Sequence, residues 1–275
     1  MRFSCIITAM NEWQPSGVIT ITTDFGHKGP FAAVMQGAIV KRFADARIID
    51  LAHDIPAHWP PEAGFWLSRS YQYFPSGTVH MAIVDPGVGT ERDVLLVVKD
   101  GHLFIAPDNG LLAPLAENAD RVCKLNEDAL DRIGLGTPSL TFHGRDMFAP
   151  LAADLAAGKI CVDDIGTDST DWIPGLIEDP QVGSARVSGI VITVDAFGNL
   201  ISNIDASLIE SFGNPMVNVA GKTIAMTTAY GRVSPGEFLA LINSFGVVEI
   251  ARSEDNAADG LGCERGAPVV ITDAK

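Results

Sequence analysis

The run of residues that fixes the class of fold is Val18-Ile19-Thr20-Ile21-Thr22-Thr23, which stops at the turn Asp24-Phe25-Gly26. A β-branched run bounded by a turn is typical of a buried strand. Residues 31–43 have the spacing of a helix, and residues 47–51 form a second short strand. Strands that alternate with helices predict an α/β fold with a mostly parallel sheet flanked by helices.

The alternation continues to about residue 160. We expect a helix over 60–69, a strand over 79–84, a hairpin of 94–98 with 103–106, and a helix over 148–157. Ligands of such sheets bind at the carboxyl ends of the strands. Aspartates that follow these strands are therefore candidate site residues.

The pattern changes in the second half of the chain. Short β segments separated by turn residues predict a small antiparallel β barrel or sandwich. The stretch before it is rich in Asp, Thr, Pro and Gly, as linkers often are. The predicted order is an N-terminal extension (1–16), an α/β domain (17–164), a linker (165–182) and a β domain (183–275).

Composition limits the partners. The 275 residues carry a formal net charge of −15 and no visible Lys/Arg cluster, so we expect neither nucleic acid nor membrane as a partner. A negative field attracts a cationic small molecule. The four cysteines are far apart and form no CxxC pair, which favours the reducing cytoplasm over a zinc or disulfide framework.

The densest motif is Asp85-Pro86-Gly87-Val88-Gly89-Thr90-Glu91-Arg92, which follows the third strand. Proline and glycine let backbone approach whatever lies beside Asp85, and Arg92 can return to the same pocket. His143 lies between Phe142 and Gly144, where an accessible imidazole can orient or deprotonate water. Asp24 suits the two hydroxyls of a ribose, or else it caps the next helix.

Two further patterns each allow two interpretations. The turn of Asp195, Phe197 and Asn199 can hold a flat heterocycle by stacking and edge hydrogen bonds, or can be a plain hairpin turn. The segment of His53 and His58 is a weak metal candidate, because Pro56 keeps the two rings off one helical face. We expect no metal and no cofactor.

Seven stretches in order resemble the S-adenosylmethionine hydrolases, also called SAM hydroxide adenosyltransferases, the water-using relatives of fluorinases and chlorinases. They are Thr23-Asp24-Phe25-Gly26, Asp50-Leu51-Ala52-His53-Asp54-Ile55-Pro56, Val84-Asp85-Pro86-Gly87-Val88-Gly89-Thr90, Ala106-Pro107-Asp108-Asn109-Gly110-Leu111-Leu112, Phe142-His143-Gly144-Arg145-Asp146, Asp195-Ala196-Phe197-Gly198-Asn199 and Asn243-Ser244-Phe245-Gly246.

The resemblance implies that S-adenosylmethionine and water react at the ribose C5′ to give adenosine and methionine. It also implies a homotrimer in which the ligand lies between the first domain of one subunit and the second domain of its neighbour. Asp85, Arg92 and His143 would hold and activate water, with either Asp85 or His143 as the base.

The resemblance assigns the remaining candidates to parts of the substrate. Asp24 would bind the ribose hydroxyls, and His58 would lie beside the ribose. Positions around adenine are matched by Phe197, Asn199, Tyr230 and Arg252. Asp195 and Ser244 match positions near the methionine part, and Phe245 is a further aromatic candidate.

The chain departs from the family pattern at several positions. Gly29 stands where relatives often have an Asp near the methionine amine, His58 stands where an aromatic is common, and residues 253–255 lack the usual Asn. The alternatives are a halide (chloride) adenosyltransferase, a non-catalytic adenosine or S-adenosylmethionine binder, and a metal-dependent hydrolase that uses Asp24, His27, His53 and His58. Asp85 and His143 stand where fluorinases have Tyr, which favours water over a halide anion.

Overall fold

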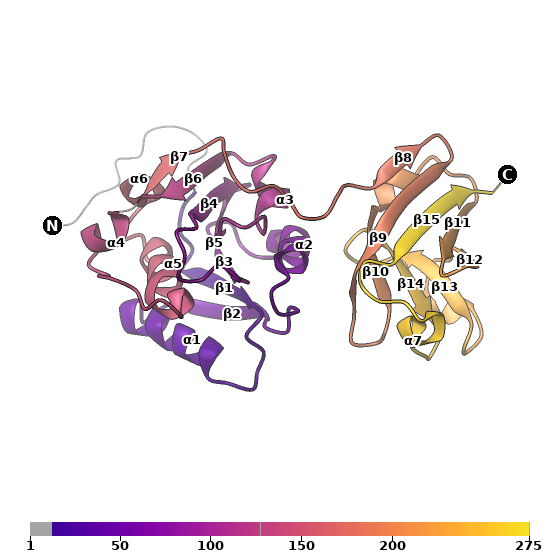
Figure 1. The fold of residues 1–275 in the computed structure, drawn as a ribbon, viewed down its shortest axis with the longest axis horizontal. Helices are drawn as coiled ribbons and strands as arrows, with labels where there is room; N and C mark the ends of the chain where they lie inside the picture. Colours follow the sequence, from indigo (N-terminus) through magenta and orange to yellow (C-terminus); the bar gives the residue numbers. More distant parts are fainter. Residues whose placement is uncertain (1–12, 127, 275) are drawn as a thin grey trace. The chain divides into compact units, whose positions relative to one another are not determined.

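The computed structural model describes residues 13–126 and 128–274, so Cys5 and most of the predicted N-terminal extension lie outside the described residues. The chain divides into two compact units, 1–176 and 177–275 (Figure 1). The boundary between the units falls inside the stretch 165–182. The first unit is α/β and the second is antiparallel β, which confirms the predicted fold class.

The first unit is built on one seven-stranded sheet in the order β2-β1-β3-β5-β4-β6-β7. The strands are β1 Val18–Thr23, β2 Arg47–Ala52, β3 Val79–Ile83, β4 Val94–Lys99, β5 His102–Pro107, β6 Arg121–Leu125 and β7 Gly166–Asp168. The pairs β2-β1, β1-β3 and β3-β5 are parallel, whereas the pairs from β5 through β7 are antiparallel. The sheet is therefore mixed, and its parallel half carries the strand ends with the candidate aspartates.

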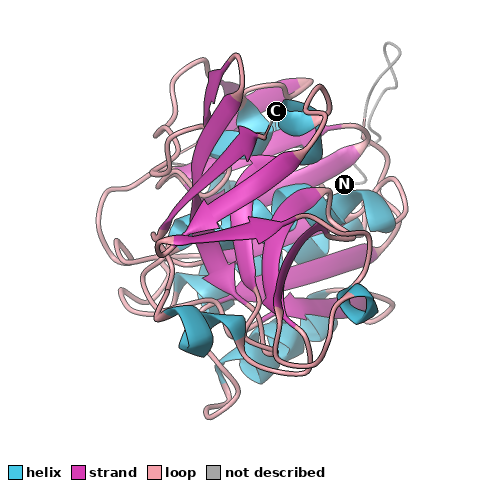
Figure 2. Cartoon of the chain, turned by 90° about the vertical axis from the view of Figure 1, so that its right-hand side faces the viewer, coloured by secondary structure: helices cyan, strands magenta, loops and turns pink. Residues whose placement is uncertain are grey.

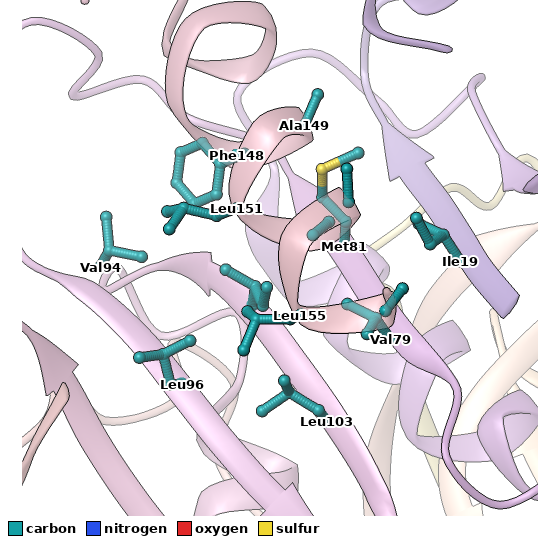
Figure 3. Close-up of a cluster of buried hydrophobic side chains, with 14 of the residues drawn as sticks. Ile19, Val79, Met81, Val94, Leu96, Leu103, Phe148, Ala149, Leu151 and Leu155 are labelled. Carbon is teal, nitrogen blue, oxygen red and sulfur yellow. The ribbon is translucent and has the colours of Figure 1, made fainter. Parts of the chain in front are cut away.

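Helices cover both faces of this sheet (Figure 1). The helices are α1 Phe31–Arg42, α2 Pro60–Ser70, α3 Ala113–Ala116, α4 Ala129–Arg132, α5 Ala149–Ala156 and α6 Val162–Ile165. Alternate strand residues point to opposite faces, which gives two cores. One core joins α1 and α5 to the sheet, and Figure 3 shows Phe148 and Leu155 packed beside Met81 and Leu96. The other joins α2 and α3 to residues such as Phe104.

The second unit consists of eight antiparallel strands and few short helices (Figures 1 and 2). The elements are β8 Gln181–Gly183, β9 Arg186–Val194, β10 Leu200–Asp205, β11 Pro215–Val219, β12 Lys222–Ala225, β13 Phe238–Ile242, β14 Val247–Arg252, α7 Ala257–Leu261 and β15 Pro268–Asp273. The path runs β12-β11-β15-β9-β10-β14-β13, and β8 pairs with β9. An isolated bridge between Met226 and Ala240 brings the two ends together, so the sheet is a nearly closed barrel.

The barrel interior is apolar. Val187, Val217, Val248 and Ile250 are fully buried and belong to one cluster. The next residue along β14, Glu249, points to the other face of its strand, as the alternation of strand residues requires. Among the described helices of both units, none is long and apolar enough to cross a membrane.

Candidate active site

Two neighbouring parallel strands deliver the first candidate carboxylates. In the pairing of β1 with β3, Thr23 lies opposite Ile83. Asp24 follows Thr23 directly, and Asp85 comes two residues after Ile83. Both carboxylates therefore lie at the carboxyl edge of the sheet, where α/β proteins bind ligands.

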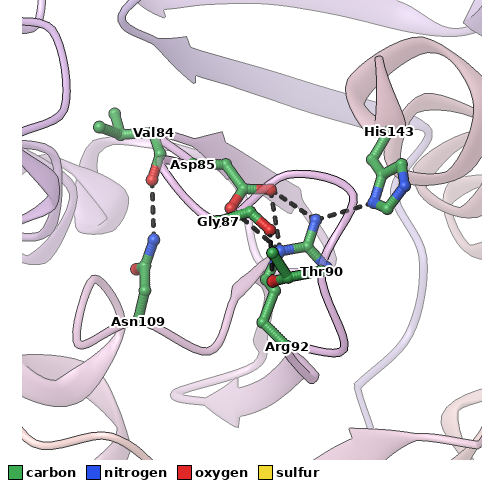
Figure 4. A network of polar contacts seen from close by, with 7 residues as sticks. All are labelled: Val84, Asp85, Gly87, Thr90, Arg92, Asn109 and His143. Carbon is green, nitrogen blue, oxygen red and sulfur yellow. Dashed lines mark hydrogen bonds and ion pairs between the residues drawn. The ribbon is translucent and has the colours of Figure 1, made fainter. Parts of the chain in front are cut away.

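Arg92 holds the Asp85 carboxylate with several charge-assisted hydrogen bonds. Its Nε donates to Oδ1 at 3.0 Å and to Oδ2 at 2.9 Å, and its second terminal nitrogen also donates to Oδ2 (Figure 4). The side chains of Asp85 and Arg92 are only 6% and 11% exposed. A fork geometry of this kind fixes the carboxylate in one orientation.

The same guanidinium also reaches His143, with 3.0 Å between the terminal nitrogen of Arg92 and His143 Nδ1 (Figure 4). A guanidinium donates and cannot accept, so Nδ1 must be the unprotonated nitrogen of the ring. The proton of neutral His143 then lies on Nε2, which becomes a hydrogen-bond donor. Burial, followed by the charge of Arg92, lowers the pKa of His143 from its ordinary value of 6.5.

The chain around His143 is shaped by tight packing. The residue stands at the start of a π-helical turn, Gly144–Phe148, a rare geometry that often occurs at functional sites. The Phe148 ring lies 5.5 Å from the guanidinium carbon of Arg92. Gly89 has a φ of +81°, and a Cβ there would lie 2.3 Å from the Leu140 carbonyl oxygen. Only glycine lets the turn after Asp85 approach the segment that leads to His143.

Asn109 supports the turn after β3 and was not among the predicted site residues. Its amide nitrogen donates to the Val84 carbonyl at 2.8 Å, and its side-chain oxygen accepts from the Leu111 backbone N–H at 3.3 Å (Figure 4). It therefore fixes the backbone immediately before Asp85. The Asp-Asn-Gly turn was a signal in the sequence, although turn residues of this kind are common.

Asp24 is held by its own strand end and by a loop of the same unit. Its Oδ2 accepts the His58 backbone N–H at 3.1 Å, and His58 has a φ of 61°. The Thr23 hydroxyl accepts from the Phe25 N–H at 3.2 Å and forms a second hydrogen bond with His53 Nδ1, 2.8 Å away. Buried His53 thus braces the turn that carries Asp24.

The metal alternative gains no support from the positions of these groups. Nowhere in residues 13–126 and 128–274 do three or more His, Cys, Asp or Glu side chains gather as a metal would require. His27 lies 3.7 Å from Asp54, and His53 lies 3.0 Å from Asp50. Asp50 is inside β2, not at a strand end, and it also accepts the Gln36 amide at 2.8 Å.

In the second unit, Asp195 organises the turn between β9 and β10. Its Oδ1 accepts the backbone N–H groups of Phe197 and Asn199, both at 2.9 Å, and its Oδ2 accepts the Asn199 amide at 3.0 Å. Asn199 is buried, whereas Phe197 is 79% exposed. The turn therefore presents an aromatic ring to solvent on a fixed backbone.

The other predicted residues of this unit lie at or beside β14. Ser244 is exposed and Phe245 is half-buried in the turn before the strand. Arg252 ends the strand, where it donates to the Gly236 carbonyl at 2.9 Å and pairs with Asp255 at 2.8 Å. These contacts give Arg252 a structural role within the unit.

Tyr230 is half-exposed, and its hydroxyl donates to Glu249 at 2.6 Å. Glu249 was missed by the sequence analysis, because one acid inside an apolar strand, Val247-Val248-Glu249-Ile250-Ala251, gives no motif.

Two family models match this chain. Residues 19–166 match the SAM hydroxide adenosyltransferase N-terminal domain, and residues 189–270 match the SAM hydroxide adenosyltransferase C-terminal domain. The chain belongs to the SAM hydroxide adenosyltransferase family.

The relatives with the highest sequence identity that we describe are named as hydrolases. An (R)-S-adenosyl-L-methionine hydrolase from Salinispora tropica is 33% identical over 262 residues, covering 94% of this chain and 98% of that protein. A hydrolase of the same name from Thermus thermophilus is 33% identical and covers 90% and 96%. A fluorinase from an Actinoplanes species is more distant, at 25% identity over 71% of this chain and 74% of its own.

Among solved structures, an uncharacterised conserved protein from Thermotoga maritima has the same fold. It aligns with a TM-score of 0.84 at 32% identity, covering 92% of this chain and 99% of its own length.

Proposed function

We propose that this chain is a hydrolase that converts S-adenosyl-L-methionine and water to adenosine and L-methionine. The observation that carries the proposal is the chain of contacts from Asp85 through Arg92 to His143 in a member of this family. Relatives that align over nearly their whole length are named (R)-S-adenosyl-L-methionine hydrolases. Binding alone would not need such a polar chain at the sheet edge.

The reaction is a nucleophilic displacement. A bond forms between the water oxygen and the ribose C5′, while the bond from C5′ to sulfur breaks and its electron pair stays on sulfur. The sulfonium leaves as the neutral thioether of methionine, so the leaving group itself needs no proton. Holding the water in line with the C5′–S bond is then the main task of the protein.

The contacts of Arg92 suggest how the three residues divide the work. Since Nδ1 of His143 accepts from Arg92, its Nε2–H is the group free to orient the oxygen of the water. The Asp85 carboxylate, although bound by Arg92, keeps acceptor capacity and takes the proton that the water loses. Arg92 fixes both partners and balances the charge of the carboxylate.

The rest of the substrate is recognised without a metal or cofactor. Asp24 accepts the ribose hydroxyls, with His58 beside it, and Phe197 stacks on adenine. Asn199, Tyr230 and Arg252 complete the adenine side, while Asp195, Ser244 and Phe245 lie toward the methionine part. The overall negative charge of −15 suits a substrate that carries a sulfonium cation.

We further propose that the enzyme acts as a cytoplasmic homotrimer with its site at the subunit interface. Each unit leaves large apolar side chains exposed: Phe31 and Val40 on α1 in the first, Phe197 and Ile242 in the second. Such groups suit a protein interface. Cys123 and Cys263 form no disulfide, which suits a reducing compartment.

Incubation with S-adenosylmethionine, with and without chloride and followed by chromatography, tests the function. The proposal predicts adenosine and methionine in equal amounts, with no dependence on chloride or on a chelator. 5′-Chloro-5′-deoxyadenosine would instead identify a halide adenosyltransferase, and tight binding without turnover would identify a binding protein. Loss of activity on chelation would identify a metal-dependent hydrolase.

A further inference from the structure

Glu249 is a buried acid that the proposed reaction does not use. Its side chain lies on β14 and the residue is 3% exposed. Val248 and Ile250 on either side face the barrel core, so Glu249 faces outward, opposite Ile201 of β10 and Leu241 of β13. A buried carboxylate is costly unless its oxygens are bound, so its partners indicate its purpose.

Both oxygens of Glu249 have partners, and neither partner is a cation. Oε1 accepts the Tyr230 hydroxyl at 2.6 Å, and Oε2 accepts the Asn243 amide at 3.2 Å. Hydrogen bonds to a charged acceptor are stronger than those between neutral groups. The carboxylate therefore ties two separate segments to the same strand.

The first of these segments is the short turn Tyr230–Arg232. Its neighbour Val233 packs on the small cluster of Leu239, Leu241 and Ala251 on the outer face of β13 and β14. Tyr230 itself is 47% exposed. Its ring thus reaches solvent while its hydroxyl is anchored, which is the arrangement that a stacking residue needs.

The second segment is the turn from Asn243 to Gly246. The side-chain oxygen of Asn243 accepts the backbone N–H groups of Phe245 at 3.0 Å and Val247 at 3.3 Å. The same amide donates its nitrogen to Glu249, so Glu249 fixes which way the amide faces. The position of exposed Ser244 follows from that turn.

Asp195 brings a third segment near this acid. Its negative charge contributes to the raised pKa values of Glu249 and Tyr230, in both cases behind burial as the larger cause. Strand pairing places the turn that presents Phe197 nearby, because Ile201 of β10 lies opposite both Glu249 and Thr193 of β9. Two loops that carry predicted substrate residues are thus bonded to this carboxylate, and a third begins two residues after Thr193.

We propose that Glu249 is a positioning residue that holds Tyr230 and the Asn243 turn in the arrangement that binds the adenosine part of the substrate. The proposal rests on the proposed function, and it assigns Glu249 no contact with the substrate. Its removal should weaken binding and leave the displacement step unchanged, because Asp85, Arg92 and His143 belong to the other unit.

Glutamine and alanine at this position have different consequences. In Glu249→Gln, the new side-chain oxygen can accept from Asn243 while its amide donates to the oxygen of Tyr230, so both segments stay tied. In Glu249→Ala, both partners lose their acceptor. Tyr230→Phe removes only the first tie. Ser202→Ala is the matched control, because it deletes another buried side-chain bond in this barrel, from Ser202 to the Val248 carbonyl at 2.7 Å.

The test measures kcat and KM for S-adenosylmethionine, and the Kd of adenosine by calorimetry, in the full-length wild type and these four variants. We expect Glu249→Ala to raise KM and the adenosine Kd together by about 10-fold, with kcat within about twofold of wild type. Tyr230→Phe should give part of that rise, and Glu249→Gln should stay within about threefold of wild type.

The proposal is overturned if Glu249→Ala and Ser202→Ala change KM and Kd equally, or if Glu249→Ala lowers kcat at unchanged KM. Should Glu249→Ala fail to fold, Tyr230→Phe with an unchanged adenosine Kd overturns it as well. Failure of the proposed function is recognised separately, because wild type would then bind adenosine without converting S-adenosylmethionine. The Kd comparison among the variants still judges Glu249 in that case.

Discussion

The two units each bury one acid at their candidate site, and the two acids have opposite kinds of partner. Asp85 in the first unit is bound by a guanidinium, which in turn contacts a histidine. Glu249 in the second unit is bound by a hydroxyl and an amide, both uncharged. The first arrangement holds a carboxylate that can accept a proton. In the second, the carboxylate holds two loops in place.

This difference teaches how the work is divided along the chain. Under the proposed function, the charges that respond to bond making and breaking lie at the carboxyl edge of the first sheet. The aromatic and polar groups proposed to recognise the nucleoside lie on the turns of the barrel. Variants of Asp85, Arg92 and His143 should therefore change kcat, and variants in the turns of the barrel should change KM.

The largest expected effect comes from Asp85→Asn. The substitution removes the charge that accepts the proton and sets an amide donor against Arg92. We predict a fall in kcat of about 10²- to 10⁴-fold with KM changed little, measured as initial rates of adenosine release.

The control for this variant is Asp154→Asn. Asp154 is equally buried, with 4% of its side chain exposed, and it pairs with Arg42 near the carboxyl end of α5. Both variants should lose stability in a thermal melt, and only Asp85→Asn should lose turnover. Similar losses of turnover in both would mean that Asp85 acts through folding alone.

His143 should give the next largest effect. His143→Ala removes the donor that orients water, and we expect kcat to fall about 10- to 100-fold. Because burial and Arg92 lower its pKa from the ordinary value of 6.5, wild-type His143 takes up a proton at a lower pH than an ordinary histidine. A charged ring would place a proton on Nδ1 against Arg92, so the decline of activity on the acid side should likewise come at a lower pH.

The pH profile of kcat/KM tests whether protonation of His143 lowers activity. His143→Gln, which keeps a donor and does not titrate, should retain more activity than His143→Ala and should lack the part of the acid limb that belongs to His143. An unchanged profile in His143→Gln would show that His143 is not the group that titrates.

Phe197, in the turn between β9 and β10, should give a moderate effect on KM alone. Phe197 is 79% exposed, so Phe197→Ala should leave the melting temperature unchanged. Loss of stacking on adenine should raise KM for S-adenosylmethionine about 10-fold, with kcat constant. Phe197→Tyr keeps the ring and should behave as wild type. A fall in kcat in Phe197→Ala would contradict the claim that the barrel turns affect KM alone.

The smallest effect should come from Thr23→Val, which removes the hydroxyl between His53 and the Phe25 N–H. The turn that carries Asp24 loses its brace, and we expect KM to rise about threefold. Thr20→Val is the matched control, because buried Thr20, three residues earlier on the same strand, contacts His80 at 2.7 Å. Equal KM values in the two variants would contradict a role for this brace.

Much of the fold could be predicted because its signals are local. Periodicity indicated β1, α1 and the β4-β5 hairpin, whose turn residues Asp100 and Gly101 both have positive φ. The strand β10 was missed, since Leu200–Asp205 follows the Asp195 turn directly and mixes polar with apolar residues. The pairings of β6 with β4 and of β7 with β6 join strands that are distant in sequence, and no local pattern determines them.

The candidate site was predictable only where special residues cluster. Asp85 and Arg92 stand out in one Pro- and Gly-rich motif. The structure adds that Arg92 contacts both Asp85 and His143. Asn109, His53 and Glu249 act through other residues, and their importance arises from burial and partners that are distant in sequence. A single sequence carries no direct signal for such contacts.

The account depends most on water attacking the ribose C5′, and turnover in H₂¹⁸O tests that step directly. Mass spectrometry of the products after incubation with S-adenosylmethionine should find one ¹⁸O in adenosine, at the 5′-hydroxyl, and none in methionine. Adenosine without the label, or label in the methionine instead, would contradict displacement by water at C5′.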